Sequence, residues 1–179
     1  MNESSGGSTH TAGDLIYDAF IIGGVGGSIV AMFFLAFDAL VFGQPLFTPS
    51  LMGSVLFEGM SANSVQTVSM NAVTKYTLVH FLSFGVLGIA LSFLTHQAEI
   101  RARHPLVVIL LAFVVLEVGF WAGTAIMIPG VIHRIGLLPV AAANLLAAVG
   151  IGLYLVSSHR PDLWARFLGP TGPRRTNRD

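Results

Sequence analysis

Four strongly polar side chains fall inside the long apolar segments of this sequence, about 20–42, 77–94, 106–128 and 135–156, one in each segment. They are Asp38, His80, Glu117 and Asn144. A charged group inside a membrane is costly and faces the protein interior, so each of these side chains is a candidate functional group. If the faces that carry them converge, carboxylates, an imidazole and an amide meet in one polar core. Such a core is suited to binding a small ligand or a proton.

Two aromatic residues with polar tips accompany this set. Tyr76 precedes His80 by four residues, and Trp121 follows Glu117 by four residues. Residues four apart lie on the same face of a helix. We therefore add the phenol of Tyr76 and the indole of Trp121 to the candidate ligand- or proton-binding residues.

One structural interpretation and one metal interpretation both fit these residues. In the structural interpretation, His80, Glu117 and their neighbours form a satisfied hydrogen-bond network that fixes the register of the helices. In the metal interpretation, Asp38, His80 and Glu117 supply the imidazole and the two carboxylates of a non-haem iron, manganese or zinc site. Four-helix bundles build such sites between facing helices, but the Glu-x-x-His pair that is typical of them is absent.

A haem or a proton pathway makes further demands on the same residues. A bis-histidine haem needs two histidines at similar depth, and the partner for His80 is His133, at the very end of its segment. We therefore rank haem below a quinone, a lipid or another small ligand. In a proton pathway, Glu117 loads and releases the proton while His80 and Asp38 connect it to the outside. The inner halves of the segments contain few polar groups, which weakens this interpretation.

The composition excludes several classes of protein. Of the 179 residues, 54% are hydrophobic and 10% are charged, whereas a soluble domain carries roughly 25% charge. The net charge is zero, so nothing indicates nucleic-acid binding. Cysteine is absent, which removes disulfides and thiolate metal sites. No G-x-S-x-G, H-E-x-x-H or Walker motif occurs, so no catalytic residue or cofactor is indicated and we lean away from an enzyme.

The apolar segments predict an all-α membrane protein with four transmembrane helices in a compact bundle. A membrane helix needs about 20 mostly apolar residues. We expect helices over about 15–42, 73–97, 105–129 and 134–158, a disordered polar tail over 1–13, and a basic tail over 161–179. The runs do not alternate in polarity, which argues against barrel strands.

The cations predict the orientation. Only Lys75 and Arg134 lie on one side of the predicted bundle. The other seven of the nine cations follow the second or the fourth helix: Arg101, Arg103, Arg160, Arg166, Arg174, Arg175 and Arg178. By the positive-inside rule both termini are then cytoplasmic. We expect a bacterial cytoplasmic membrane and the lipid bilayer as partner.

The first outer loop is long enough to hold a further element. Thr48 followed by Pro49 is a helix-start signal, with the hydroxyl as cap and proline in the first turn. Gly59 is a plausible stop. We expect a half-helix over about 49–58 that lies at the interface or re-enters the membrane. It is either a plain lid over the bundle or the cover of a binding cavity that opens outward.

Small residues predict close helix packing. Small-xxx-small pairs begin at Gly23, Gly24, Gly119, Ala143 and Ala148, and such faces bring membrane helices together. They fit a tight bundle, a homodimer or a larger membrane complex. The sequence thus favours a binding or accessory subunit with an outward-facing polar pocket. A membrane oxidoreductase component holding a metal, haem or quinone, and a small proton- or ion-coupled carrier, are the alternatives.

Overall fold

The computed structural model describes residues 12–99, 105–127 and 130–159, and within these ranges it is all-helical. Four long helices are α1 (Ala12–Val41), α3 (Met70–Glu99), α4 (Pro105–Met127) and α6 (Leu137–His159). Two short helices are α2 (Phe47–Glu58) and α5 (Val131–Ile135). The all-α prediction is confirmed. Of the two predicted tails, residues 1–11 of the first and the whole of 161–179 lie outside the described residues.

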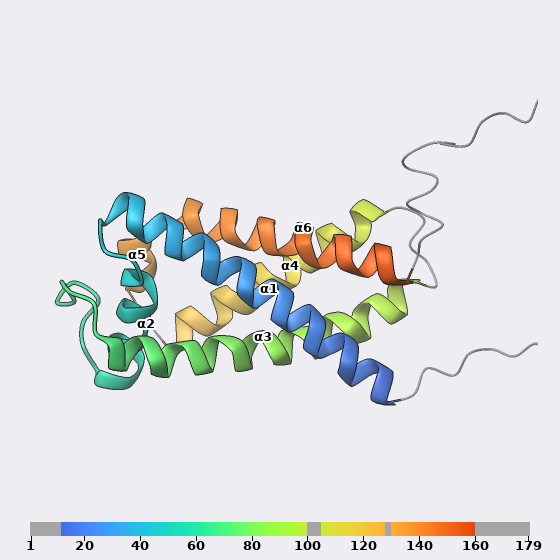
Figure 1. Ribbon diagram of the computed structural model, residues 1–179, viewed down its shortest axis with the longest axis horizontal. Coiled ribbons are helices and arrows are strands. Elements are labelled where there is room, and N and C mark those ends of the chain that lie inside the picture. Colours follow the sequence, from blue (N-terminus) through green and yellow to red (C-terminus); the bar gives the residue numbers. More distant parts are fainter. Residues whose placement is uncertain (1–11, 100–104, 128–129, 160–179) are drawn as a thin grey trace, which may run out of the picture.

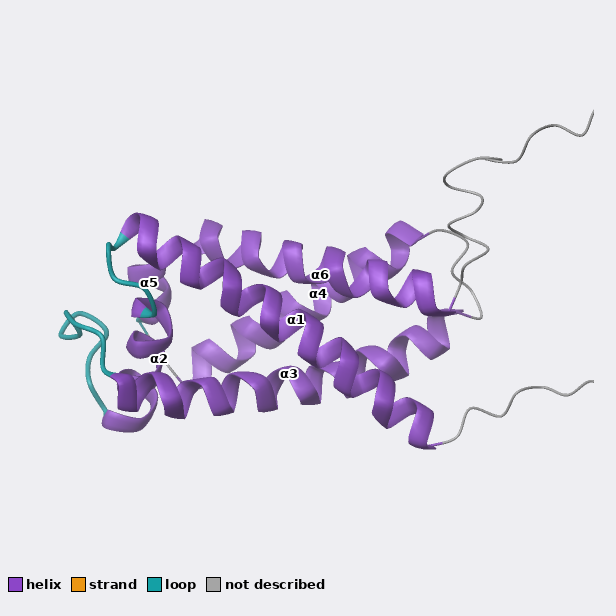
Figure 2. Ribbon diagram, in the orientation of Figure 1, coloured by secondary structure: helices purple, strands orange, loops and turns teal. Residues whose placement is uncertain are grey.

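The long helices run side by side, and the short ones lie together at one end of the bundle (Figure 1). The first turn of α1 and the last turn of α6 lie at the opposite end (Figure 1). Apart from the helices, the described chain consists of loops gathered at the end that holds α2 and α5 (Figure 2). We call this the α2 end of the bundle.

Four helices are long and apolar enough to cross a membrane, which indicates an integral membrane protein. Their candidate spans are Ala19–Val41, Met70–Phe93, Leu106–Ile126 and Leu137–Leu155. Their outward faces are apolar, since Leu40 is 86% exposed and Ile126 is 82% exposed. Exposure of such apolar side chains to water is unfavourable, whereas lipid tails provide an apolar environment for them.

The fourth predicted helix, 134–158, is divided in the structure. Gly136 has φ 91°, a conformation that favours glycine, and it separates α5 from α6. Its N–H donates to the carbonyl of Ile132 at 2.8 Å and so ends α5. Pro139 lies in the first turn of α6, where its missing N–H costs nothing. The prediction missed this break because the apolar run continues through it.

Glycines bring α1 and α3 into backbone contact. A Cβ on Gly88 would clash with the carbonyl oxygen of Ala19, and one on Gly23 would lie 2.6 Å from the carbonyl oxygen of Phe84. The small-residue face that begins at Gly23 is therefore used inside the chain, as close membrane packing requires. A Cβ on Gly24 would meet nothing within 4 Å, so the neighbouring face is not used in this way.

A methyl group at this crossing should separate α1 from α3. We expect Gly88→Ala to destabilise the protein by about 1–3 kcal/mol through overpacking. Gly85→Ala is the matched control, because a Cβ there meets nothing within 4 Å and alanine favours the helix. Thermal unfolding in detergent, followed by circular dichroism, measures both. Equal melting temperatures for the two variants would contradict the crossing.

Candidate functional site

Asp38 binds the start of α2. Its side chain is fully buried, with 0% exposed. One carboxylate oxygen, Oδ2, accepts a hydrogen bond from the Thr48 N–H at 2.7 Å, and Oδ1 accepts one from the Thr48 hydroxyl at 2.6 Å. The first N–H groups of a helix lack partners within the helix, and its N-terminus favours negative charge. Asp38 is therefore an anchor for α2 and has both oxygens engaged.

The start of α2 differs from the prediction in one respect. The helix begins at Phe47, and Leu46 occupies the cap position with φ 69° and no side-chain cap. The Thr48 hydroxyl, which we expected to cap the helix, donates to Asp38 instead. A short helix does follow, and it ends at Gly59, the predicted stop, which has φ 66° and donates its N–H to the Ser54 carbonyl.

His80 faces α1 and is surrounded by aromatic side chains. Its Nε2 lies 3.0 Å from the carbonyl oxygen of Gly27. The ring centroid lies 4.8 Å from that of Phe84, 5.3 Å from that of Phe81 and 5.8 Å from that of Tyr76. The sequence correctly paired His80 with Tyr76 on one helix face.

Glu117 joins α4 to α6. Its Oε1 accepts a hydrogen bond from the Asn144 side-chain amide at 3.0 Å, and its Oε2 accepts one from the Trp121 indole N–H at 3.0 Å. Asn144 is buried, with 5% exposed, while Glu117 is partly buried. The predicted convergence of polar groups thus holds for this pair, whereas Asp38 and His80 each have a different partner.

The predicted metal set is not assembled. Among the residues that the structure describes, no group of three His, Asp or Glu side chains could hold a metal ion, so Asp38, His80 and Glu117 form no such set. The carboxylates are held apart because one binds α2 and the other binds α6. The second histidine proposed for a haem, His133, lies on α5 and does not line the cavity that His80 lines.

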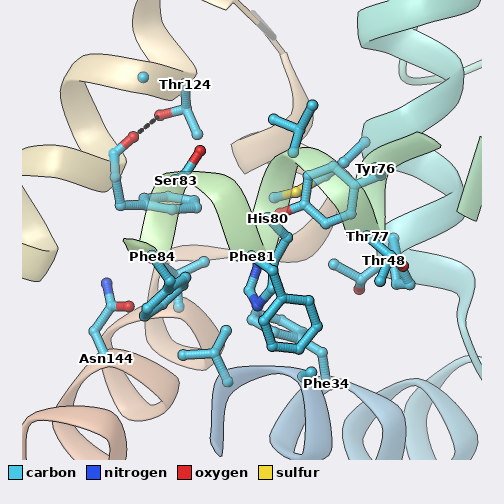
Figure 3. A pocket seen from close by; sticks show the side chains of 18 of the residues that line it. Phe34, Thr48, Tyr76, Thr77, His80, Phe81, Ser83, Phe84, Thr124 and Asn144 are labelled. Atoms are coloured by element: carbon cyan, nitrogen blue, oxygen red, sulfur yellow. Dashed lines mark hydrogen bonds between the residues drawn. The ribbon is translucent and has the colours of Figure 1, made fainter. Parts of the chain in front are cut away.

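A cavity of about 240 Å³ lies between the long helices beneath α2. Tyr76, His80 and Asn144 line it, whereas Asp38, Glu117 and Trp121 do not. Figure 3 shows Tyr76 and His80 from α3 on one side of this space and Asn144 from α6 on another. The cavity therefore selects three of the six candidate residues, and none of these three is a carboxylate.

Sequence reasoning missed much of the wall. Thr48, Phe34, Phe84 and Thr124 line the cavity with the candidate residues. One signal was present, since Phe84 follows His80 by four residues on the same face of α3. The contributions of α1, α2 and α4 depend on tertiary packing and leave no such pattern.

Arg134 fastens the α2 end of the bundle. Its guanidinium donates to the carbonyls of Ala62, Asn63 and Val65 at 2.9–3.1 Å, and lies 5.5 Å from the ring centroid of Phe47. One side chain thus joins α5, the loop after α2 and the first residue of α2. The sequence indicated Arg134 only as one of the two cations at this end.

Comparisons with protein-family models, with curated proteins and with solved structures find no match.

Removing the Asp38 carboxylate should release the start of α2. We expect Asp38→Ala to speed amide hydrogen exchange over 47–51 by roughly ten- to a hundredfold, because the buried Thr48 N–H loses its acceptor at a cost of about 1–3 kcal/mol. Hydrogen–deuterium exchange with mass spectrometry measures this. Glu58→Ala at the exposed end of α2 is the control and should change exchange little. Unchanged protection of 47–51 in Asp38→Ala would refute the anchor.

The three carbonyls around Arg134 should require a guanidinium. We expect Arg134→Lys to expose the 59–69 loop to limited proteolysis, because an ammonium lacks the planar fork that reaches several carbonyls at once. Lys75→Arg is the matched control, since Lys75 is exposed on α3. Identical cleavage rates in Arg134→Lys and the unmodified protein would show that charge alone suffices.

Proposed function

We propose that this protein binds a small, neutral, largely apolar molecule in the intramembrane cavity beneath α2. The observation that carries the proposal is the cavity itself, about 240 Å³ between helices that are apolar enough to cross a membrane. Ligand sites are concave, mostly apolar and furnished with a few polar groups, and helix bundles place them between facing helices. The wall here has that character, with phenylalanines, leucines and valines around Tyr76, His80 and Asn144.

The charge of the wall favours a neutral ligand. The two carboxylates within the spans, Asp38 and Glu117, are directed to Thr48, Trp121 and Asn144 and do not line the cavity. The cations Lys75 and Arg134 do not line it either. An ionic ligand would therefore lie in an apolar surrounding without a counter-charge, at a high cost in free energy.

The short helix α2 supports the role of a cover. Thr48, Pro49 and Met52 from this helix line the cavity. The helix is held at its start by Asp38 and packs so closely on α3 that a Cβ on Gly53 would clash with the Ala72 carbonyl. A cover fixed at these points gives the cavity a defined end.

The proposal extends to orientation and setting. Seven of the nine cations follow the second or the fourth long helix in sequence, and the positive-inside rule assigns that end to the cytoplasm. The α2 end then faces outward across a bacterial cytoplasmic membrane, and the cavity lies closer to the outer surface. A binding protein of this kind acts by itself, as a homodimer or as an accessory subunit of a larger membrane complex.

A larger side chain in the cavity wall should prevent the bound molecule from occupying the cavity. Gly123 lines the cavity and a Cβ there meets nothing within 4 Å, so Gly123→Leu places a side chain in open space. We expect small lipid-soluble molecules to be recovered from the unmodified protein in lipid nanodiscs and to be lost from Gly123→Leu. Solvent extraction followed by mass spectrometry measures their amounts, with empty nanodiscs subtracted.

The control is the same glycine-to-leucine substitution at a position outside the cavity. A Cβ on Gly24 would also meet nothing within 4 Å, but Gly24 does not line the cavity, so Gly24→Leu should retain the molecules. Extracts that are the same for the unmodified protein, Gly123→Leu and Gly24→Leu would refute binding in this cavity.

A further inference from the structure

The hydroxyl donors in the cavity wall are largely engaged within the protein. The Thr48 hydroxyl donates to Asp38 at 2.6 Å. The hydroxyls of Thr77 and Thr124 donate to carbonyls of the preceding turn of their own helices at 2.8 and 2.9 Å. A hydroxyl has one hydrogen to donate, so these three residues offer a ligand only oxygen lone pairs.

His80 offers an acceptor as well. The Gly27 carbonyl can only accept a hydrogen bond, so the hydrogen of the imidazole lies on Nε2. The charged ring would be costly within a membrane span, and neither Asp38 nor Glu117 lines the cavity that His80 lines. In the neutral ring Nδ1 therefore carries a lone pair, and no other described residue forms a hydrogen bond with it.

Asn144 presents a third kind of acceptor, an amide oxygen, beside the hydroxyl oxygens and the imidazole nitrogen. A carboxylate accepts hydrogen bonds, so the nitrogen of the Asn144 amide is directed to Glu117. The remaining atom, Oδ1, accepts no hydrogen bond from the residues described, although the side chain is only 5% exposed. Figure 3 shows this oxygen on the side of Phe84, within the cavity wall. A buried carbonyl without a partner is unfavourable, and a hydrogen bond from a ligand would remove this cost.

Among the described residues of the wall, two further hydroxyls have a hydrogen to give. Tyr76 and Ser83 line the cavity, and neither side-chain hydroxyl forms a hydrogen bond with another residue in the described part of the chain. Each can accept as readily as it donates. The wall therefore holds more acceptors than donors, and a complementary ligand must bring a donor of its own.

Aromatic rings define the shape of the same wall. Phe34, Phe81, Phe84 and Phe120 line the cavity together with Tyr76. Aromatic rings prefer offset or edge-to-face contacts with other rings, which favours a planar ring in the ligand. Figure 3 shows Phe34, Phe81 and Phe84 grouped around His80. A ligand ring that packs on these phenylalanines would therefore place its substituents beside the imidazole acceptor.

We infer that the cavity binds a neutral, lipid-soluble aromatic alcohol of the phenol or hydroquinone type, whose O–H donates to Nδ1 of His80. This inference rests on the proposed function and specifies its ligand. A site built from acceptors rejects an analogue that lacks the donor, because the acceptors are then left unpaired.

Two probes that differ in one donor test the inference. The first is 1-naphthol, and the second is 1-methoxynaphthalene, which replaces the O–H by O–CH₃. Saturation binding to the full protein in nanodiscs, with empty nanodiscs subtracted, gives both affinities. We expect 1-naphthol to bind roughly tenfold more tightly, which corresponds to one hydrogen bond.

Two variants at one position assign the preference to His80. His80→Phe keeps an aromatic ring without an acceptor and should abolish the preference for 1-naphthol over 1-methoxynaphthalene. His80→Gln keeps an amide that can donate to Gly27 and accept from the ligand, and should restore most of it. A preference that persists unchanged in His80→Phe would overturn the assignment to this residue.

The outcomes separate the two proposals. Equal affinities for both probes, abolished together by Gly123→Leu, would overturn the donor preference and leave ligand binding in the cavity standing. If neither probe binds above the level of empty nanodiscs, the ligand class and the proposed function both fail.

Discussion

A buried carboxylate at the start of a short helix holds the α2 end of the bundle in place. A short helix at the end of a membrane bundle begins with N–H groups that lipid cannot satisfy. Asp38 accepts two short hydrogen bonds from Thr48, and Pro49 has no N–H that would need an acceptor. The carboxylate is fully buried, and the helix start offers it a favourable partial charge. The anchor fixes α2 on α1, and Gly53 then seats it against α3.

The cavity follows from how α1 and α3 are spaced. In one region their backbones meet, because Gly23 and Gly88 have no side chains to separate them. Nearer the α2 end, the inserted short helix contributes Thr48 and Met52 to the space between the long helices. Because α1 and α3 touch at one point and diverge towards α2, side chains fill the gap between them only in part. Tyr76 and His80 of α3 therefore line a cavity and are not fully packed against α1.

The spans and α2 could be predicted because they follow from local signals. Apolar runs of about 20 residues mark membrane helices, and Gly59 ended α2 where a positive φ was required. The partners could not be predicted in this way. Asp38 meets Thr48 across a turn whose geometry depends on Leu46 at positive φ, and Glu117 meets Asn144 across 27 residues of sequence. Periodicity assigns a residue to a helix face, but it does not specify how two helices are rotated relative to each other. For that reason the sequence placed Asp38 and Glu117 in one polar core, whereas the structure directs them to separate partners.

Arg134 makes the joint between α5 and the loop after α2 insensitive to acid. A guanidinium stays charged throughout the range in which proteins fold, and the carbonyls of Ala62, Asn63 and Val65 do not titrate. A salt bridge to a carboxylate would weaken as acid protonated the acceptor, but this junction has no acceptor that acid can remove. The loop after α2 and the helix α5 therefore stay joined when the medium turns acidic. In the proposed orientation this end faces outward, so the joint between α5 and the loop after α2 does not depend on the pH of the outer medium, whereas the carboxylate of Asp38 at the start of α2 can be protonated.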